Sequence, residues 1–109
     1  MMVTGRKDTR MGLSIALDEL LSTGWSGLDS SGCAFDTDGR TYPTVSRVRQ
    51  EFTRSGFELS LTRIDRFHCF RAEWREAGSG VEAGSVISNS ENEAAVYALA
   101  QLRRSLVTV

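Results

Sequence analysis

Residues 57–76 read FELSLTRIDRFHCFRAEWRE, and this stretch decides the fold because apolar and polar side chains alternate along it. The alternation places the larger apolar side chains on one face of an extended chain: Phe57, Leu59, Leu61, Phe70, Ala72 and Trp74. A period of two is typical of antiparallel strands with one face on a core and the other in water. The stretch therefore predicts two paired strands.

The connection between these strands is a tight loop around Asp65 and Arg66, either two or four residues long. Both lengths keep the apolar side chains on one face. The two-residue loop sets Glu58 opposite Glu73, whereas the four-residue loop sets Glu58 opposite Arg75. Opposite charges stabilise a cross-strand pair. We therefore prefer the four-residue loop.

The segment that follows, VEAGSVIS at 81–88, predicts a third strand after a Gly78-Ser79-Gly80 turn. We expect it to be an edge strand, with a bulge at Gly84. Residues 88–104, SNSENEAAVYALAQLRR, then predict a closing helix. Ser90 and Glu93 form a capping box at its start. The expected buried stripe of this helix is Ala95, Leu99, Leu102 and Leu106.

Two further helices are predicted before the strands. Apolar side chains at helical spacing indicate a helix over about 11–23 and another from Pro43 to Gly56. Between them lies a long loop, 26–43, in which CAF and RTY flank an Asp38-Gly39 turn and could pair as a short hairpin.

The chain as a whole is predicted to be one domain. We expect a disordered tail at 1–10 and a single α+β domain over 11–109. The expected architecture has two layers, a three-stranded antiparallel sheet with helices packed on one face, plus an extra N-terminal helix. A length of 109 residues and 40% hydrophobic content agree with one globular domain.

The composition also bears on location. The segment after the basic N-terminus contains Asp18 and Glu19, which argues against a secretory signal, and no apolar run is long enough to span a membrane. We expect a cytoplasmic protein that does not bind membranes. Cys33 and Cys69 are far apart in the sequence and are expected to be reduced thiols.

The charges nearly cancel, with 13 basic and 14 acidic residues. A general nucleic-acid binder usually has a strong basic excess. Residues 40–75, however, hold eight arginines against four acids. Twelve of the thirteen basic residues are arginine, which favours a GC-rich, bacterial genome as the source. A local basic surface is therefore one expectation.

Residues 43–106 resemble the double-stranded RNA-binding domain, on the predicted α-β-β-β-α order and the final S-x-x-E-A-A-x-x-A-L-x-x-L pattern. The order is also similar to that of small phage-derived α-β-β-β-α sandwich proteins. The resemblance implies lysines that clamp phosphates at the start of the last helix. Glu91, Asn92 and Glu93 occupy those places here. We therefore hypothesise that any nucleic acid is bound in some other manner than that family's.

No residue pattern predicts a catalytic or metal site, and we expect no cofactor. His68 and Cys69 are adjacent, and successive strand side chains point to opposite faces, so they cannot converge; His68 is expected on the apolar side. The Asp36–Gly39 stretch fails the register of a calcium loop, because position twelve would be Val45. The sequence therefore predicts a protein that is not an enzyme.

The predicted function is a non-enzymatic protein-interaction module that binds a protein partner or itself. Its expected working surface is the polar sheet face or the third-strand edge. The alternative is an RNA- or DNA-binding domain that uses the arginine-rich region 40–75. The candidate binding residues are Arg47, Arg54, Arg71, Arg75 and Tyr42. The competing interpretation of these arginines is a solvated surface with ordinary ion pairs.

Overall fold

The computed structural model describes residues 4–26, 32–35 and 39–107, without the side chains of 4–11 and 107. The elements follow in the order α1 (Thr4–Leu21), β1 (Cys33–Phe35), β2 (Thr41–Pro43), α2 (Val45–Arg54), β3 (Phe57–Ile64), a 3-10 turn (Asp65–Phe67), β4 (Cys69–Glu76), β5 (Glu82–Ser88) and α3 (Glu91–Val107). Strands β3, β4 and β5 form an antiparallel sheet in that order, and β1 and β2 form a separate hairpin. The α+β class and the α-β-β-β-α order are confirmed.

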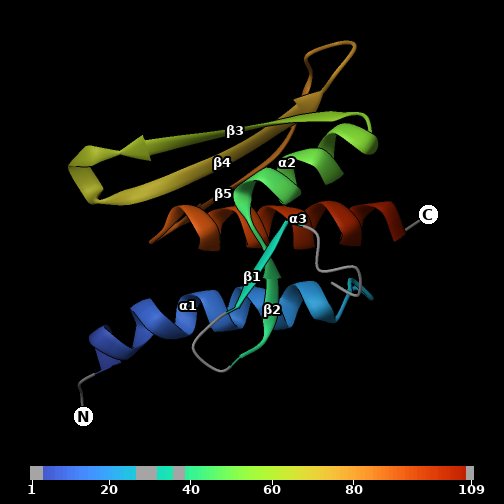
Figure 1. The fold of residues 1–109 in the computed structure, drawn as a ribbon. Coiled ribbons are helices and arrows are strands. Elements are labelled where there is room, and N and C mark those ends of the chain that lie inside the picture. Colours follow the sequence, from blue (N-terminus) through green and yellow to red (C-terminus); the bar gives the residue numbers. More distant parts are fainter. Residues whose placement is uncertain (1–3, 27–31, 36–38, 108–109) are drawn as a thin grey trace.

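The elements are stacked with α3 in the middle (Figure 1). Helices α2 and α3 lie on one face of the three-stranded sheet, while α1 packs against α3 on the side away from the sheet. Helices α1 and α3 run in the same direction, since Gly12 lies against Glu93 and Thr23 against Arg103. The extra N-terminal helix thus extends the core through α3 and has little contact with the sheet.

The composition of α3 explains why it can pack on several sides at once. Its buried residues are Glu93, Ala94, Ala95, Val96, Ala98, Leu99, Ala100 and Leu102. Small alanine side chains let neighbouring elements approach the helix backbone closely, while Leu99 and Leu102 fill the core. The expected stripe is confirmed except at its end. Leu106 is 48% exposed, because it lies in the last turn, beyond the final buried residue of the helix.

The register of the β3–β4 hairpin confirms the four-residue loop. Glu58 is opposite Arg75, and the strands are joined by residues 65–68. The prediction for His68 is wrong. His68 lies in the turn, is exposed and has a left-handed backbone with φ of 53°, so strand alternation does not apply to it.

The bulge predicted in β5 is confirmed. Trp74 is opposite Gly84 but the next residue, Arg75, is opposite Glu82, so one residue of β5 is extra. A Cβ atom on Gly84 would lie 2.4 Å from Cζ2 of Trp74. Glycine is needed at this position because the indole of Trp74 packs directly on the backbone of β5.

The remaining boundaries differ slightly from those predicted. Helix α1 begins at Thr4 and not at 11, and α2 begins at Val45 with Thr44 as its N-cap. The predicted hairpin in the 26–43 loop is confirmed, although Asp38 of its turn lies outside the described residues. The division into a tail at 1–10 and one domain stays a prediction. No described helix is long and apolar enough to cross a membrane.

Candidate functional site

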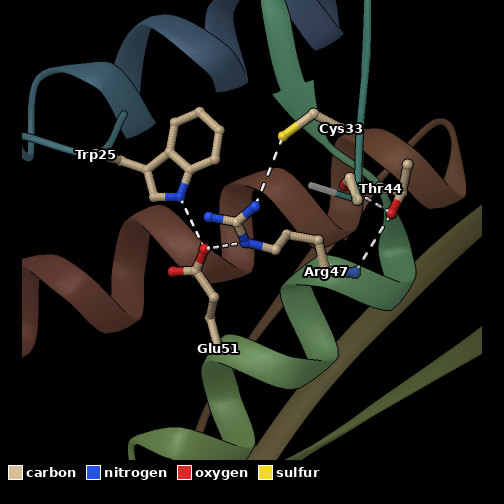
Figure 2. Close-up of polar contacts among 6 residues, drawn as sticks. Trp25, Cys33, Thr44, Arg47 and Glu51 are labelled. Carbon is tan, nitrogen blue, oxygen red and sulfur yellow. Dashed lines mark hydrogen bonds and ion pairs between the residues drawn. The ribbon is translucent and has the colours of Figure 1, made fainter. Parts of the chain in front are cut away.

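Arg47, the first of the candidate binding residues, belongs to a polar cluster that joins three segments of the chain (Figure 2). Its Nε donates to Oε2 of Glu51 at 2.8 Å, and Nε1 of Trp25 donates to the same oxygen at 2.9 Å. The side chains of Arg47 and Glu51 are only 11% and 15% exposed. Nη1 of Arg47 also lies 3.8 Å from Sγ of Cys33. The cluster therefore ties α2 to the segment that follows α1 and to β1.

The structure does not bring the other candidate arginines to Arg47. Arg71 and Arg75 alternate with the buried Ala72 and Trp74, so they lie on the opposite face of the sheet from α2. Arg54 is exposed at the last turn of α2. The fifth candidate, Tyr42, is half-buried and packs against the core. The five residues are distributed over at least three separate surfaces.

The open face of the three-stranded sheet is a surface on which polar side chains from all three strands meet. It carries Glu58, Ser60, Thr62, Arg71, Glu73, Arg75, Ser85 and Ile87. Arg71 pairs with Glu73 at 3.3 Å, and Arg75 lies between Glu58 and Glu82 in the register. Charges of both signs thus alternate over this face, and it presents no uniformly basic patch.

The two edges of the sheet differ in how their backbone groups are satisfied. Ala77 N–H donates to the Gly56 carbonyl at 2.9 Å, which sets the hydrogen-bonding phase of the β3–β4 pair. Because this phase alternates, the carbonyl of Leu59 points away from β4, toward the free edge of β3. Nη1 of Arg49 on α2 donates to that carbonyl at 2.7 Å. Helix α2 therefore covers part of the β3 edge.

No described residue covers the β5 edge in the same way. By the same alternation, Gly84, Val86 and Ser88 direct their backbone groups toward β4, so those of Ser85 and Ile87 point outward. Among the described residues, none hydrogen-bonds these outward groups. The Ile87 side chain is 62% exposed beside them. The β5 edge therefore combines unpaired backbone groups with an apolar side chain.

Glu93, the capping-box glutamate, has a different place from the one expected. Ser90 Oγ accepts from the Glu93 N–H at 3.1 Å, which confirms the N-cap. The Glu93 carboxylate, however, is turned inward against Gly12 and accepts a hydrogen bond from the Asn89 backbone. Its buried Oε1 has no hydrogen-bond partner in the described part of the chain. Burial raises its pKa, although the Asn89 bond acts in the opposite direction. The pKa of Tyr97 is also raised, first by burial and then by the nearby charges of Glu93 and Glu19.

The inward Glu93 changes the comparison with phosphate-binding helices. Of the residues in the lysine positions, only Glu91 and Asn92 are exposed, while Glu93 is 6% exposed. The roles of Arg49 and of the buried carboxylate escaped the sequence interpretation. Gly12 was the available signal, because a glycine inside a helix often indicates a close approach by another element.

Comparisons with protein-family models, with curated proteins and with solved structures find no match for this chain. The resemblance to the double-stranded RNA-binding domain therefore rests on the order of the elements and on the residue pattern of the last helix. In the part of the chain that the structure describes, no three His, Cys, Asp or Glu side chains gather where they could hold a metal ion.

Proposed function

We propose that this chain is a non-enzymatic protein-interaction module whose β5 edge accepts an extended segment of another polypeptide. The observation that carries the proposal is the difference between the two edges. Arg49 donates a hydrogen bond to an outward carbonyl of β3, whereas the outward backbone groups of Ser85 and Ile87 on β5 have no described partner. An added strand supplies partners for such groups.

The side chains around this edge support a protein partner. In strand addition, main-chain hydrogen bonds supply affinity and alternate side chains supply specificity. Ile87 offers an exposed apolar contact on the open face, next to Arg71 on the neighbouring strand. An apolar residue beside balanced charges suits a polypeptide better than a phosphate backbone, which binds mainly through an excess of Lys and Arg.

In this proposal the α2-β3-β4-β5-α3 unit has the same scaffold as the double-stranded RNA-binding domain but a different working surface. Two observations favour that view over the nucleic-acid alternative. Arg47 is held by Glu51, and Arg75 lies between two glutamates. Phosphate binding through these arginines would have to break the Arg47–Glu51 ion pair and overcome the repulsion between phosphate and the two glutamates beside Arg75.

Site-specific photocrosslinking tests the proposal. A photoreactive phenylalanine analogue replaces Ile87 on the β5 edge or, as a matched control, Thr62 on the open face over β3, in cells that naturally make the protein. We expect protein adducts at 87 and few at 62. Adducts only at 62 would move the surface to the sheet face. The absence of adducts at both positions would overturn the proposal, and salt-sensitive binding of a nucleic-acid duplex would then favour the nucleic-acid alternative.

A further inference from the structure

Resting on the proposed function, we infer that the partner at the β5 edge is a second copy of this chain. The two β5 strands pair antiparallel about Val86, so that Ser85 of one copy faces Ile87 of the other. The outward backbone groups of β5 select this register, and the charges on the adjacent strand β4 agree with it.

The backbone groups restrict the register first. A two-fold axis perpendicular to the sheet requires residues from the same face to pair. Only three registers then pair outward residues of the regular part of β5: Ser85 with itself, Ile87 with itself, or Ser85 with Ile87. The last makes two hydrogen-bonded pairs from strand residues alone, and it satisfies the outward groups of both copies. Each of the other two registers makes one such pair. Any further pair in those registers would involve a residue in the bulge or beyond Ser88.

The charges on β4 agree with the same register. Arg71 is beside Ile87, and Glu73 is beside Ser85. When Ser85 faces Ile87, the residues opposite one another on the four central strands of the dimer form a row. Each such row has Arg71 of one copy at one end and Glu73 of the other copy at the opposite end. Pairing Ser85 with itself would instead align two Glu73 residues, and pairing Ile87 with itself would align two Arg71 residues. The sign of the interaction is favourable only in the mixed register. Its size is small, because the row ends are about 14 Å apart between Cα atoms, beyond the screening length at physiological salt, and Arg71 already pairs with Glu73 of its own copy at 3.3 Å. The backbone groups therefore select the register, and the charges agree with it.

The resulting assembly is a continuous six-stranded sheet with the α2 and α3 helices of both copies on one face. Each exposed Ile87 would lie across from Ser85 and diagonal to the second Ile87, within reach of an apolar contact. On the helix-facing side, the two Val86 side chains would meet directly. In this register Val86 is the only residue of β5 that lies opposite the same residue of the second copy, and this feature makes the register testable.

The first measurement is the mass of the full chain by sedimentation over about 1 µM to about 1 mM. We expect the mass to rise from the 12.0 kDa of one chain toward twice that value. Ser85→Pro removes an outward N–H that the pairing needs, and it should therefore abolish the rise in mass. The variant should still fold, because an edge strand tolerates proline where the N–H faces solvent. Arg63→Pro removes an N–H from the β3 edge and is the matched control. Ile87→Lys should also abolish the rise, whereas Leu106→Lys, at another exposed apolar residue, should not.

The register is tested by oxidation in a background in which Cys33 and Cys69 are replaced by serine. We expect Val86→Cys to form a disulfide-linked dimer, and Ser85→Cys and Ile87→Cys to remain largely unlinked. Crosslinking at Ser85→Cys or Ile87→Cys alone would overturn the register. A wild-type chain that stays monomeric throughout, with no Val86→Cys dimer, would overturn self-association. Photocrosslinking at residue 87 separates this outcome from failure of the proposed function. Adducts with a different protein would leave the protein-interaction proposal standing, whereas the absence of adducts at both positions would overturn that proposal and self-association together.

Discussion

The guanidinium of Arg49 lies 2.7 Å from the carbonyl oxygen of Leu59, so α2 supplies a hydrogen bond that a neighbouring strand would otherwise make. This contact distinguishes the two edges of an otherwise regular three-stranded sheet. A covered edge discourages the addition of a strand, and an uncovered edge permits it. The position of one arginine on α2 therefore bears on where a partner strand can bind.

Replacing Arg49 tests this role. We expect Arg49→Ala to lower the free energy of unfolding by about 1–2 kcal/mol, because a part-buried hydrogen bond from a charged donor to a backbone carbonyl is lost. The variant should also self-associate through β3. Arg54→Ala, an exposed arginine on the same helix, is the control and should change neither property. Urea denaturation and sedimentation measure the two effects; equal behaviour of both variants would contradict the role of Arg49.

The cluster around Glu51 should be important for stability. Glu51→Ala leaves the Arg47 guanidinium and the Trp25 N–H without their shared acceptor, and we expect a loss of about 3 kcal/mol. Glu51→Gln keeps an acceptor for both donors and should lose less. Denaturation followed by tryptophan fluorescence measures the difference. If both variants were as stable as the wild type, the cluster would have no structural role.

Gly84 should be intolerant of a side chain. We expect Gly84→Ala to lower the free energy of unfolding by about 1–3 kcal/mol, because the added methyl group would overlap the Trp74 indole. Gly78→Ala is the matched control, since a methyl group added at Gly78 would meet no atom within 4 Å beyond its chain neighbours. Thermal denaturation and near-ultraviolet circular dichroism report the change. Equal losses for the two variants would contradict the packing of Trp74 on β5.

Glu93 should make stability depend on pH in a particular direction. Burial raises its pKa in the folded state above the ordinary 4.5, so the folded protein binds the proton more tightly than the unfolded chain. Its contribution to stability is then greatest below pH 4.5 and declines as the pH rises through the folded pKa. We expect Glu93→Gln to be more stable than the wild type at neutral pH and to lack this decline.

The measurement for Glu93 is urea denaturation of the wild type and Glu93→Gln at a series of pH values from mildly acidic to neutral. Glutamine has nearly the same shape and can still accept from the Asn89 backbone. Glu91→Gln, at an exposed residue of the same turn, is the control. A difference between the wild type and Glu93→Gln that does not change with pH would contradict the assignment.

The nucleic-acid alternative predicts a measurable affinity. We expect no salt-sensitive binding of a short RNA duplex, because Arg71 is paired with Glu73 and Arg47 with Glu51. Fluorescence anisotropy at low and moderate salt measures it. Binding that weakens with salt, and that is abolished by charge reversal at Arg54 and Arg71, would restore the alternative and count against a protein partner.

Much of the β architecture followed from local pattern. Alternation over 57–76 determined which side chains face the helices, and the charges of Glu58 and Arg75 favoured the loop length that the structure has. These predictions succeeded because a strand has a strict period of two, and a hairpin partner lies close in the sequence. The exposure of His68 and of Leu106 was not predicted, because strand alternation and the buried stripe of a helix stop where the element ends.

The sequence alone therefore determined the class of fold, the hairpin register and the bulge at Gly84, since each depends on neighbours within a few dozen residues. Only the tertiary structure decided that α1 packs on α3, that Glu93 turns inward onto Gly12, and that Arg49 covers β3 while the β5 edge stays open. The physical reason is that these contacts join separate elements. Whether a charged side chain is buried, paired or exposed depends on what the rest of the chain places around it.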